Sequence, residues 1–143
     1  MYDSLLVATD GSDAADVAVD HAIELAVDLE VPVYGIVVLD SRTEYDNAIV
    51  DPETVDDRRR EQASTWLEAI DERAADAGVA AETTIRRGVP HEEILAYADE
   101  RDVDAVVVGA RGRSSFSGSL LGSTVDRLVR TAGRPVLVVD GDA

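Results

Sequence analysis

Residues 105–125 read AVVVGARGRSSFSGSLLGSTV, and this stretch holds no carboxylate although 30 of the 143 residues are Asp or Glu. It opens with an apolar run of strand length and continues with glycines, serines and two arginines, Arg111 and Arg113. A buried strand excludes acids anyway, which explains residues 105–108 but not the polar residues after them. Because Gly/Ser backbones are typical of phosphate loops, the stretch predicts an anion site, with phosphate as the first candidate.

On both sides of this stretch, short apolar runs alternate with amphipathic segments. The runs typical of strands cover residues 4–9, 32–39, 80–87, 103–108 and 135–139. The segments typical of helices cover residues 14–30, 53–77, 91–101 and 119–132. This alternation predicts a parallel sheet between helices with right-handed crossovers, and the length of 143 residues fits one domain, 1–143.

Turn and cap residues mark where these elements begin and end. Ser12 or Asp13 is expected to cap the first helix, and Pro90 to occupy the first turn of the third. Gly78 and Gly133 are expected to close the second and fourth helices. The run at 80–87 alternates only loosely, which predicts an exposed strand at a sheet edge.

Two of the predicted strands end in residues suited to ligand binding. The first ends at Thr9-Asp10-Gly11 and the fourth at Gly109-Ala110-Arg111. Ligands of parallel α/β sheets bind at the carboxyl ends of the strands, where the strand order reverses. If these two strands are neighbours, their loops form one crevice.

The glycines of the fourth loop are spaced regularly. Gly112 follows Gly109 after two residues, and Gly122, Ser123 and Thr124 follow after nine more. Glycine at the first two positions would let backbone N–H groups approach a ligand, and a helix N-terminus at Gly122 would favour a phosphate. Lysine is absent from the chain, and neither a P-loop nor the dinucleotide fingerprint occurs.

This spacing resembles the nucleotide signature of the universal stress protein family, in its ATP-binding branch: Gly, two residues, Gly, nine residues, Gly, then Ser or Thr. Gly109, Gly112, Gly122 and Ser123 match it, and the similarity extends along the chain to the closing PVLVV at 135–139. The resemblance implies a Rossmann-like α/β sandwich of the adenine nucleotide alpha hydrolase type. It has four helices and five parallel strands, which lie in the order 3-2-1-4-5 when numbered along the chain.

The resemblance also implies a binding role for individual residues. Those implied around the nucleoside are Ala8, Thr9, Asp10, Val38, Val108 and Gly109, and those around the phosphates are Gly112, Gly122, Ser123 and Thr124. Asp10 has a second interpretation, as a cap of the turn that follows it. Arg111 and Arg113 lie outside the signature; a phosphate role for them rests on charge alone, and exposure to solvent is an equal alternative.

We therefore expect an adenine nucleotide, ATP or else ADP or AMP, with Mg²⁺ arriving on the phosphates. With no lysine and no obvious base or triad, we expect no catalytic residue, and a regulatory stress-response module rather than an enzyme. The alternative is slow ATP hydrolysis or self-phosphorylation near Ser123 and Thr124. Family members pair their last strand, so the resemblance implies a homodimer through residues 135–139.

Composition limits the remaining functions. The formal net charge is -17 and all 13 basic residues are arginine, which suits a very salty cytoplasm, as in a halophile, and argues against nucleic acid as a partner. No apolar run approaches the roughly 20 residues of a membrane span, and the amino end lacks the features of a signal peptide. We expect a cytoplasmic protein that does not bind membranes.

Other polar or aromatic side chains are assigned to structure. His21 falls on the apolar stripe predicted for residues 14–30 and is expected to be packed. The two histidines do not form a metal site, so no metal-binding residue is expected. Residues 58–60, three arginines on the second helix, are expected to pair with nearby acids, and Trp66 to lie in the core or at its rim.

Overall fold

The computed structural model describes residues 2–41, 52–111 and 122–140. Over these ranges, strands and helices alternate along the chain as the apolar pattern predicts. The strands are β1 (Leu5–Ala8), β2 (Val33–Asp40), β3 (Ala81–Gly88), β4 (Ala105–Gly109) and β5 (Val136–Val139). The helices are α1 (Asp13–Leu29), α2 (Pro52–Ala77), α3 (Pro90–Glu100) and α4 (Ser123–Thr131).

The five strands form one parallel sheet in the order β3-β2-β1-β4-β5, which confirms the fold class. β1 lies at the centre, and Leu5 is in register with Val33 of β2 and Ala105 of β4. The loosely alternating strand β3 lies at one edge, as expected, and the apolar strand β5 lies at the other. From β1 the chain runs to β2 on one side, whereas β4 lies on the other, so the strand order reverses between β1 and β4.

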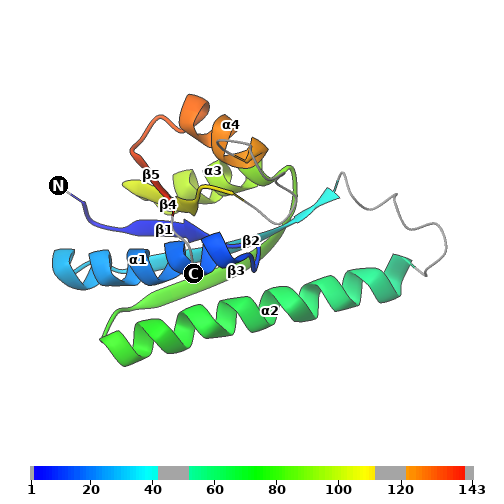
Figure 1. Ribbon diagram of the computed structural model, residues 1–143, viewed down its shortest axis with the longest axis horizontal. Helices are drawn as coiled ribbons and strands as arrows, with labels where there is room; N and C mark the ends of the chain where they lie inside the picture. Colours follow the sequence, from blue (N-terminus) through cyan, green and yellow to red (C-terminus); the bar gives the residue numbers. More distant parts are fainter. Residues whose placement is uncertain (1, 42–51, 112–121, 141–143) are drawn as a thin grey trace.

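The helices cover the two faces of the sheet in pairs (Figure 1): α1 and α2 on one face, α3 and α4 on the other. Successive residues of β1 serve different faces, since Leu5 and Val7 pack in the core beneath α1 and α2 while Leu6 packs beneath α3 and α4. Both layers are apolar, so all three residues are fully buried. A sheet covered on both faces explains why the central strands read as continuous apolar runs.

The buried face of α1 differs from the predicted stripe. The side chains that it buries are Ala15, Ala18, Val19, Ala22, Ile23 and Ala26. His21 is exposed, so the expectation that it is packed was wrong. The physical reason is the close approach of α1 to the sheet, which selects the helix face richest in alanine.

The predicted helix ends are largely confirmed. Ser12, and not Asp13, caps α1, because the Ala15 N–H donates to the Ser12 hydroxyl at 3.2 Å. Pro90 begins α3, and Gly78 and Gly133, with φ of 74° and 65°, follow the last turns of α2 and α4. Residues 119–121 of the fourth predicted helix lie outside the described ranges.

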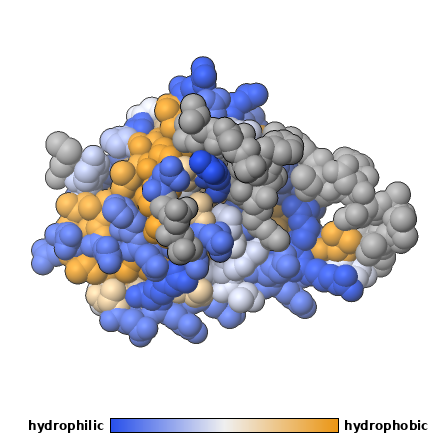
Figure 2. Space-filling model, viewed as in Figure 1, coloured by the Kyte–Doolittle hydropathy of each residue, from blue (hydrophilic) through white to orange (hydrophobic). Residues whose placement is uncertain are grey.

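The surface is hydrophilic over much of the face drawn in Figure 2. Polar side chains cover most of α2, which has a small apolar patch near its N-terminal end, whereas apolar ones gather at the C-terminal end of α1 and beside β5. The exposed apolar residues there include Val27, Leu29 and Leu137. None of the helices described here is long and apolar enough to cross a membrane.

Candidate functional site

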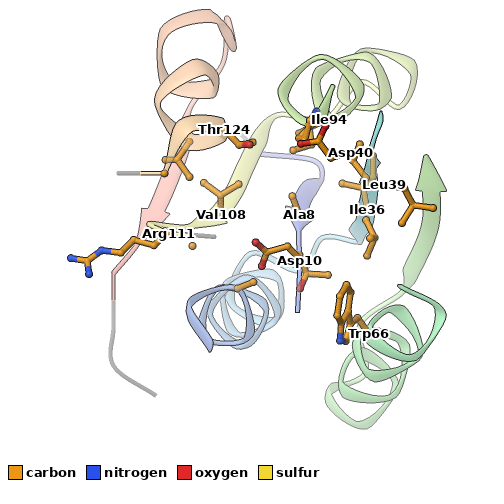
Figure 3. A pocket seen from close by; sticks show the side chains of 18 of the residues that line it. Ala8, Asp10, Ile36, Leu39, Asp40, Trp66, Ile94, Val108, Arg111 and Thr124 are labelled. Carbon is orange, nitrogen blue, oxygen red and sulfur yellow. The ribbon is translucent and has the colours of Figure 1, made fainter. Parts of the chain in front are cut away.

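A cavity of about 310 Å³ opens at the carboxyl ends of β1, β2 and β4, within the size range of small-molecule sites. It lies where the strand order reverses, so the loops after β1 and β4 border it together (Figure 3). It collects all the described residues that the sequence singled out: Ala8, Thr9, Asp10, Val38, Val108, Gly109, Arg111, Gly122, Ser123 and Thr124. Gly112 and Arg113 lie outside the described ranges.

The loop after β1 is held by its own hydrogen bonds. The buried Thr9 donates its N–H to the Ile36 carbonyl at 3.0 Å, and its hydroxyl accepts from the Gly11 N–H at 3.2 Å. Asp10 Oδ1 accepts from the Ser12 N–H at 3.0 Å, so the capping interpretation of Asp10 is confirmed. Asp10 also borders the cavity, so its role in the turn does not remove it from the cavity lining.

On the other side, the N-terminus of α4 is directed at the cavity. Its N-cap is Gly122, at φ -68° and ψ 158°, which has no side chain to occupy the first amides of the helix. The Gly122 N–H donates to the Ala110 carbonyl at 2.9 Å and ties the helix start to the end of β4. Amides of a first helical turn have no partner inside the helix and carry partial positive charge, which suits an anion.

Packing gives Gly109 a second reason to be glycine, beside the ligand approach that the sequence suggested. A Cβ at this position would lie 2.7 Å from the backbone C and O atoms of Ala14. The missing side chain therefore makes room for the first turn of α1. Gly109 borders the cavity because helix and strand meet there, and its explanation as an open approach for the ligand was incomplete.

Between the two loops, the cavity has an apolar side. Ile36 and Val38 of β2 border it, as do Ile94 of α3 and Val108 of β4. In Figure 3 the side chains of Ile36 and Ile94 lie on the β2 side of the cavity, opposite Thr124. The cavity therefore combines an apolar slot at one end with helix amides and hydroxyls at the other.

The sequence did not predict the contribution of α2. Arg59, Gln62 and Trp66 all border the cavity, and the Arg59 guanidinium donates from Nη2 to the backbone carbonyl of Asp40 at 3.3 Å. Of the predicted arginine pairs, Arg60 does bond its neighbour, at 3.2 Å from Asp56. The three missed side chains are separated by three and four residues, so one helix face presents them, and this spacing is the signal that could have found them.

Arg111 borders the cavity but is exposed. In Figure 3 its guanidinium points away from Asp10 and Val108. A charged group in this position can meet the outer phosphates of a ligand only by changing its direction. Among the described residues, no group of three His, Cys, Asp or Glu side chains could hold a metal ion.

An α/β protein with a small-molecule crevice at its strand-order reversal is the class that this geometry defines. The model of the universal stress protein family matches residues 1–140, and the chain belongs to that family. It is 32% identical to universal stress protein MJ0531 of Methanocaldococcus jannaschii, over 97% of this chain and 82% of the relative.

The solved structures show the same fold. Protein MJ0577 of M. jannaschii superposes with a TM-score of 0.88 at 28% identity, covering 100% of this chain and 99% of its own. A universal stress protein in complex with cAMP superposes with a TM-score of 0.71 at 27% identity, covering 99% of this chain and 98% of its own. A universal stress protein from Archaeoglobus fulgidus in complex with dAMP superposes with a TM-score of 0.67 at 25% identity, covering 96% of this chain and 98% of its own. These two relatives therefore bind adenine nucleotides.

Proposed function

We propose that this protein is an ATP-binding regulatory module of the stress response. The observation that carries the proposal is the cavity itself, which joins an apolar slot to the glycine-capped N-terminus of α4. An adenine base is flat and apolar on its faces, and a phosphate chain is anionic, so the two ends of the cavity match the two ends of the ligand. The cAMP and dAMP complexes of relatives support adenine as the base.

In this proposal each group of residues has a separate task. The backbone of Val38 meets the adenine edge, and Asp10 accepts from the ribose hydroxyls. The first-turn amides of α4, with the hydroxyls of Ser123 and Thr124, bind phosphate oxygens. Charged hydrogen bonds of this kind are worth about 1.5–3 kcal/mol each, so they contribute most of the phosphate affinity.

Mg²⁺ would come with the nucleotide. The described residues offer no three-ligand cluster, whereas Mg²⁺ is normally held by phosphates, waters and one or two carboxylates. Asp10, in the loop after β1, is the carboxylate of the described lining that could serve, since Asp40 lies at the apolar end beside Arg59. We expect Mg²⁺ to strengthen the binding of ATP and to have little effect on AMP.

The test of the proposed function is the identity of the co-purified ligand. The protein is purified at multimolar salt and then denatured, and the small molecules that it releases are analysed by mass spectrometry. The proposal predicts an adenine nucleotide at a substantial fraction of the protein concentration. A guanine or nicotinamide nucleotide at that level would contradict it.

An enzymatic role is the second candidate, and the placement of Ser123 and Thr124 beside the cavity favours it. A hydroxyl beside a γ-phosphate can accept it, which would give self-phosphorylation, and a water there would give slow hydrolysis. Purified protein with radiolabelled ATP distinguishes the two candidates. Label on the protein or free phosphate above a heat-killed control favours the enzyme, and neither product favours the binding module.

We further propose a homodimer through β5 in a salty cytoplasm. β5 is an edge strand, and its Leu137 side chain is 38% exposed, as is expected of an apolar strand that pairs across a two-fold axis. The charge of -17 supports the salty environment, since salt screens self-repulsion. Light scattering at multimolar salt should give twice the chain mass, and a Leu137→Asp variant should give the mass of one chain. A wild-type monomer would contradict the dimer.

A further inference from the structure

The chain has a single tryptophan, Trp66, and it stands between two cavities. The second cavity measures about 280 Å³ and lies between α1 and α2, with Asp16, Thr65 and Arg73 in its lining. Trp66 lines both cavities, and so does Thr9. The indole is therefore part of the wall that separates the candidate nucleotide site from the space behind it.

The position of the indole is fixed by the turn after β1. Gly11 has φ of 78°, and a Cβ there would overlap the Cε2 and Cζ2 atoms of the indole. The ring also packs against the core cluster beneath α1 and α2. In Figure 3 it extends from α2 toward the ends of β1 and β2, beside Asp10 and Ile36. A wide aromatic surface is thus packed between Gly11 and the core at the apolar end of the cavity.

Two further residues of α2 line the same cavity as Trp66. Gln62 and Arg59 border the same cavity one and two turns toward the N-terminus of the helix. Arg59 is oriented by its bond to the Asp40 carbonyl, at the end of β2. The apolar end is therefore enclosed by β2 and α3 from one side and by α2 from the other.

From this arrangement we propose that Trp66 is a further binding residue, against whose indole the base of the bound nucleotide packs. The inference rests on the proposed function and adds to it a wall from α2 that none of the signature glycines supplies. Aromatic rings stack on bases through their π faces, so the indole favours a purine ring over no base at all. Because Gly11 holds the ring in place, little conformational freedom is lost on binding.

Calorimetry and the emission of the single tryptophan together test this inference. In the wild-type protein, ATP should quench the indole emission over the same concentration range in which heat is released. Inorganic tripolyphosphate, which has no base, should leave the emission unchanged. This arm needs no substitution, so it holds even if a variant fails to fold.

Three variants extend the test. Trp66→Leu keeps an apolar side chain but removes the ring, and should weaken ATP binding about tenfold. Trp66→Phe keeps a smaller ring and should stay within about threefold of the wild type. Arg73→Met is the matched control, because Arg73 lines only the second cavity and bridges α2 to Asp16 and Asp20 of α1; its affinity should be that of the wild type.

The outcomes separate this inference from the proposed function. If ATP releases heat but neither changes the emission nor binds more weakly to Trp66→Leu, the role of Trp66 is wrong and the nucleotide function stands. If Arg73→Met loses as much affinity as Trp66→Leu, helix packing and not the indole is responsible, which also overturns the inference. If ATP releases no heat from the wild-type protein, both proposals fail.

Discussion

Two of the helices that begin beside the cavity, α1 and α4, start in nearly the same backbone conformation but use it differently. Ser12 caps α1 at φ -73° and ψ 163°, and Gly122 caps α4 at φ -68° and ψ 158°. At α1 the Ser12 hydroxyl accepts from the third amide of the helix, and Asp13 and Asp16 stand in its first turn. At α4 the cap is a glycine, and the one acid of its first turn, Asp126, pairs with Arg130.

This difference separates structure from ligand binding. A side-chain cap and two acids satisfy the positive end of α1, so its N-terminus contributes to stability. The N-terminus of α4 lacks such a cap within the described ranges, which leaves its positive end suited to an external anion. The account therefore expects substitutions at α1 to change stability and equivalent ones at α4 to change affinity.

The largest effect is expected where the two regions meet, at Gly109. A valine there would force side-chain atoms into the Ala14 backbone, 2.7 Å from the new Cβ. Gly109→Val should lower the free energy of unfolding by about 3 kcal/mol, measured by denaturant titration at constant salt. Gly78→Ala is the control, because nothing lies within 4 Å of its Cβ position and only the positive φ is strained. Equal losses at both sites would contradict the packing role of Gly109.

The next effect is on affinity, and it compares the two helix starts directly. Ser123→Pro removes the first amide of α4 at a position where proline fits a helix, and the ψ of 158° at Gly122 suits a following proline. We expect about tenfold weaker ATP binding by calorimetry, from one lost charged hydrogen bond. Asp13→Pro makes the same change in α1, where ATP affinity should hold. Similar losses in the two variants would remove the distinction between the helices.

A smaller change in stability is expected at the cap of α1. Ser12→Ala removes the acceptor of the Ala15 N–H and should cost about 1 kcal/mol of unfolding free energy. ATP affinity, measured in the same buffer, should not change. A loss of affinity without a loss of stability would mean that the turn after β1 binds the ligand through Ser12.

The smallest effect is expected at the hydroxyl of Ser123. Ser123→Ala keeps the backbone amide and removes one hydroxyl, whose place beside the phosphate a water molecule can take, so ATP affinity should fall by about two- to fivefold. When the ATP affinities of Ser123→Ala and Ser123→Pro are compared by calorimetry, the losses divide the contribution of Ser123 to ATP binding between its side chain and its backbone amide. If alanine costs more than proline, the hydroxyl and not the amide is the principal phosphate ligand.

Much of this architecture could be predicted because the determining interactions are local or periodic. The apolar runs located the strands, and Gly78, Pro90 and Gly133 marked helix ends correctly. The site loops could be predicted because the ends of adjacent parallel strands must lie together. The glycine spacing added Gly122 at the start of α4.

What could not be predicted depends on packing between distant segments. His21 was misplaced because the face that α1 buries is set by how closely it approaches the sheet. Trp66 was assigned to the core or its rim, although it also lines the cavity, because its contact with Gly11 joins two segments more than 50 residues apart. The role of Gly109 likewise depends on where α1 lies.

Our proposal requires the crevice between β1 and β4 to select an adenine nucleotide. Titration of the wild-type protein with ATP and, separately, with GTP at multimolar salt tests it most directly by calorimetry. The account predicts saturable binding of ATP with one site per chain and at least about tenfold weaker binding of GTP, since the base is held in a closely fitted slot. Equal affinities for the two nucleotides, or no heat with ATP, would contradict it.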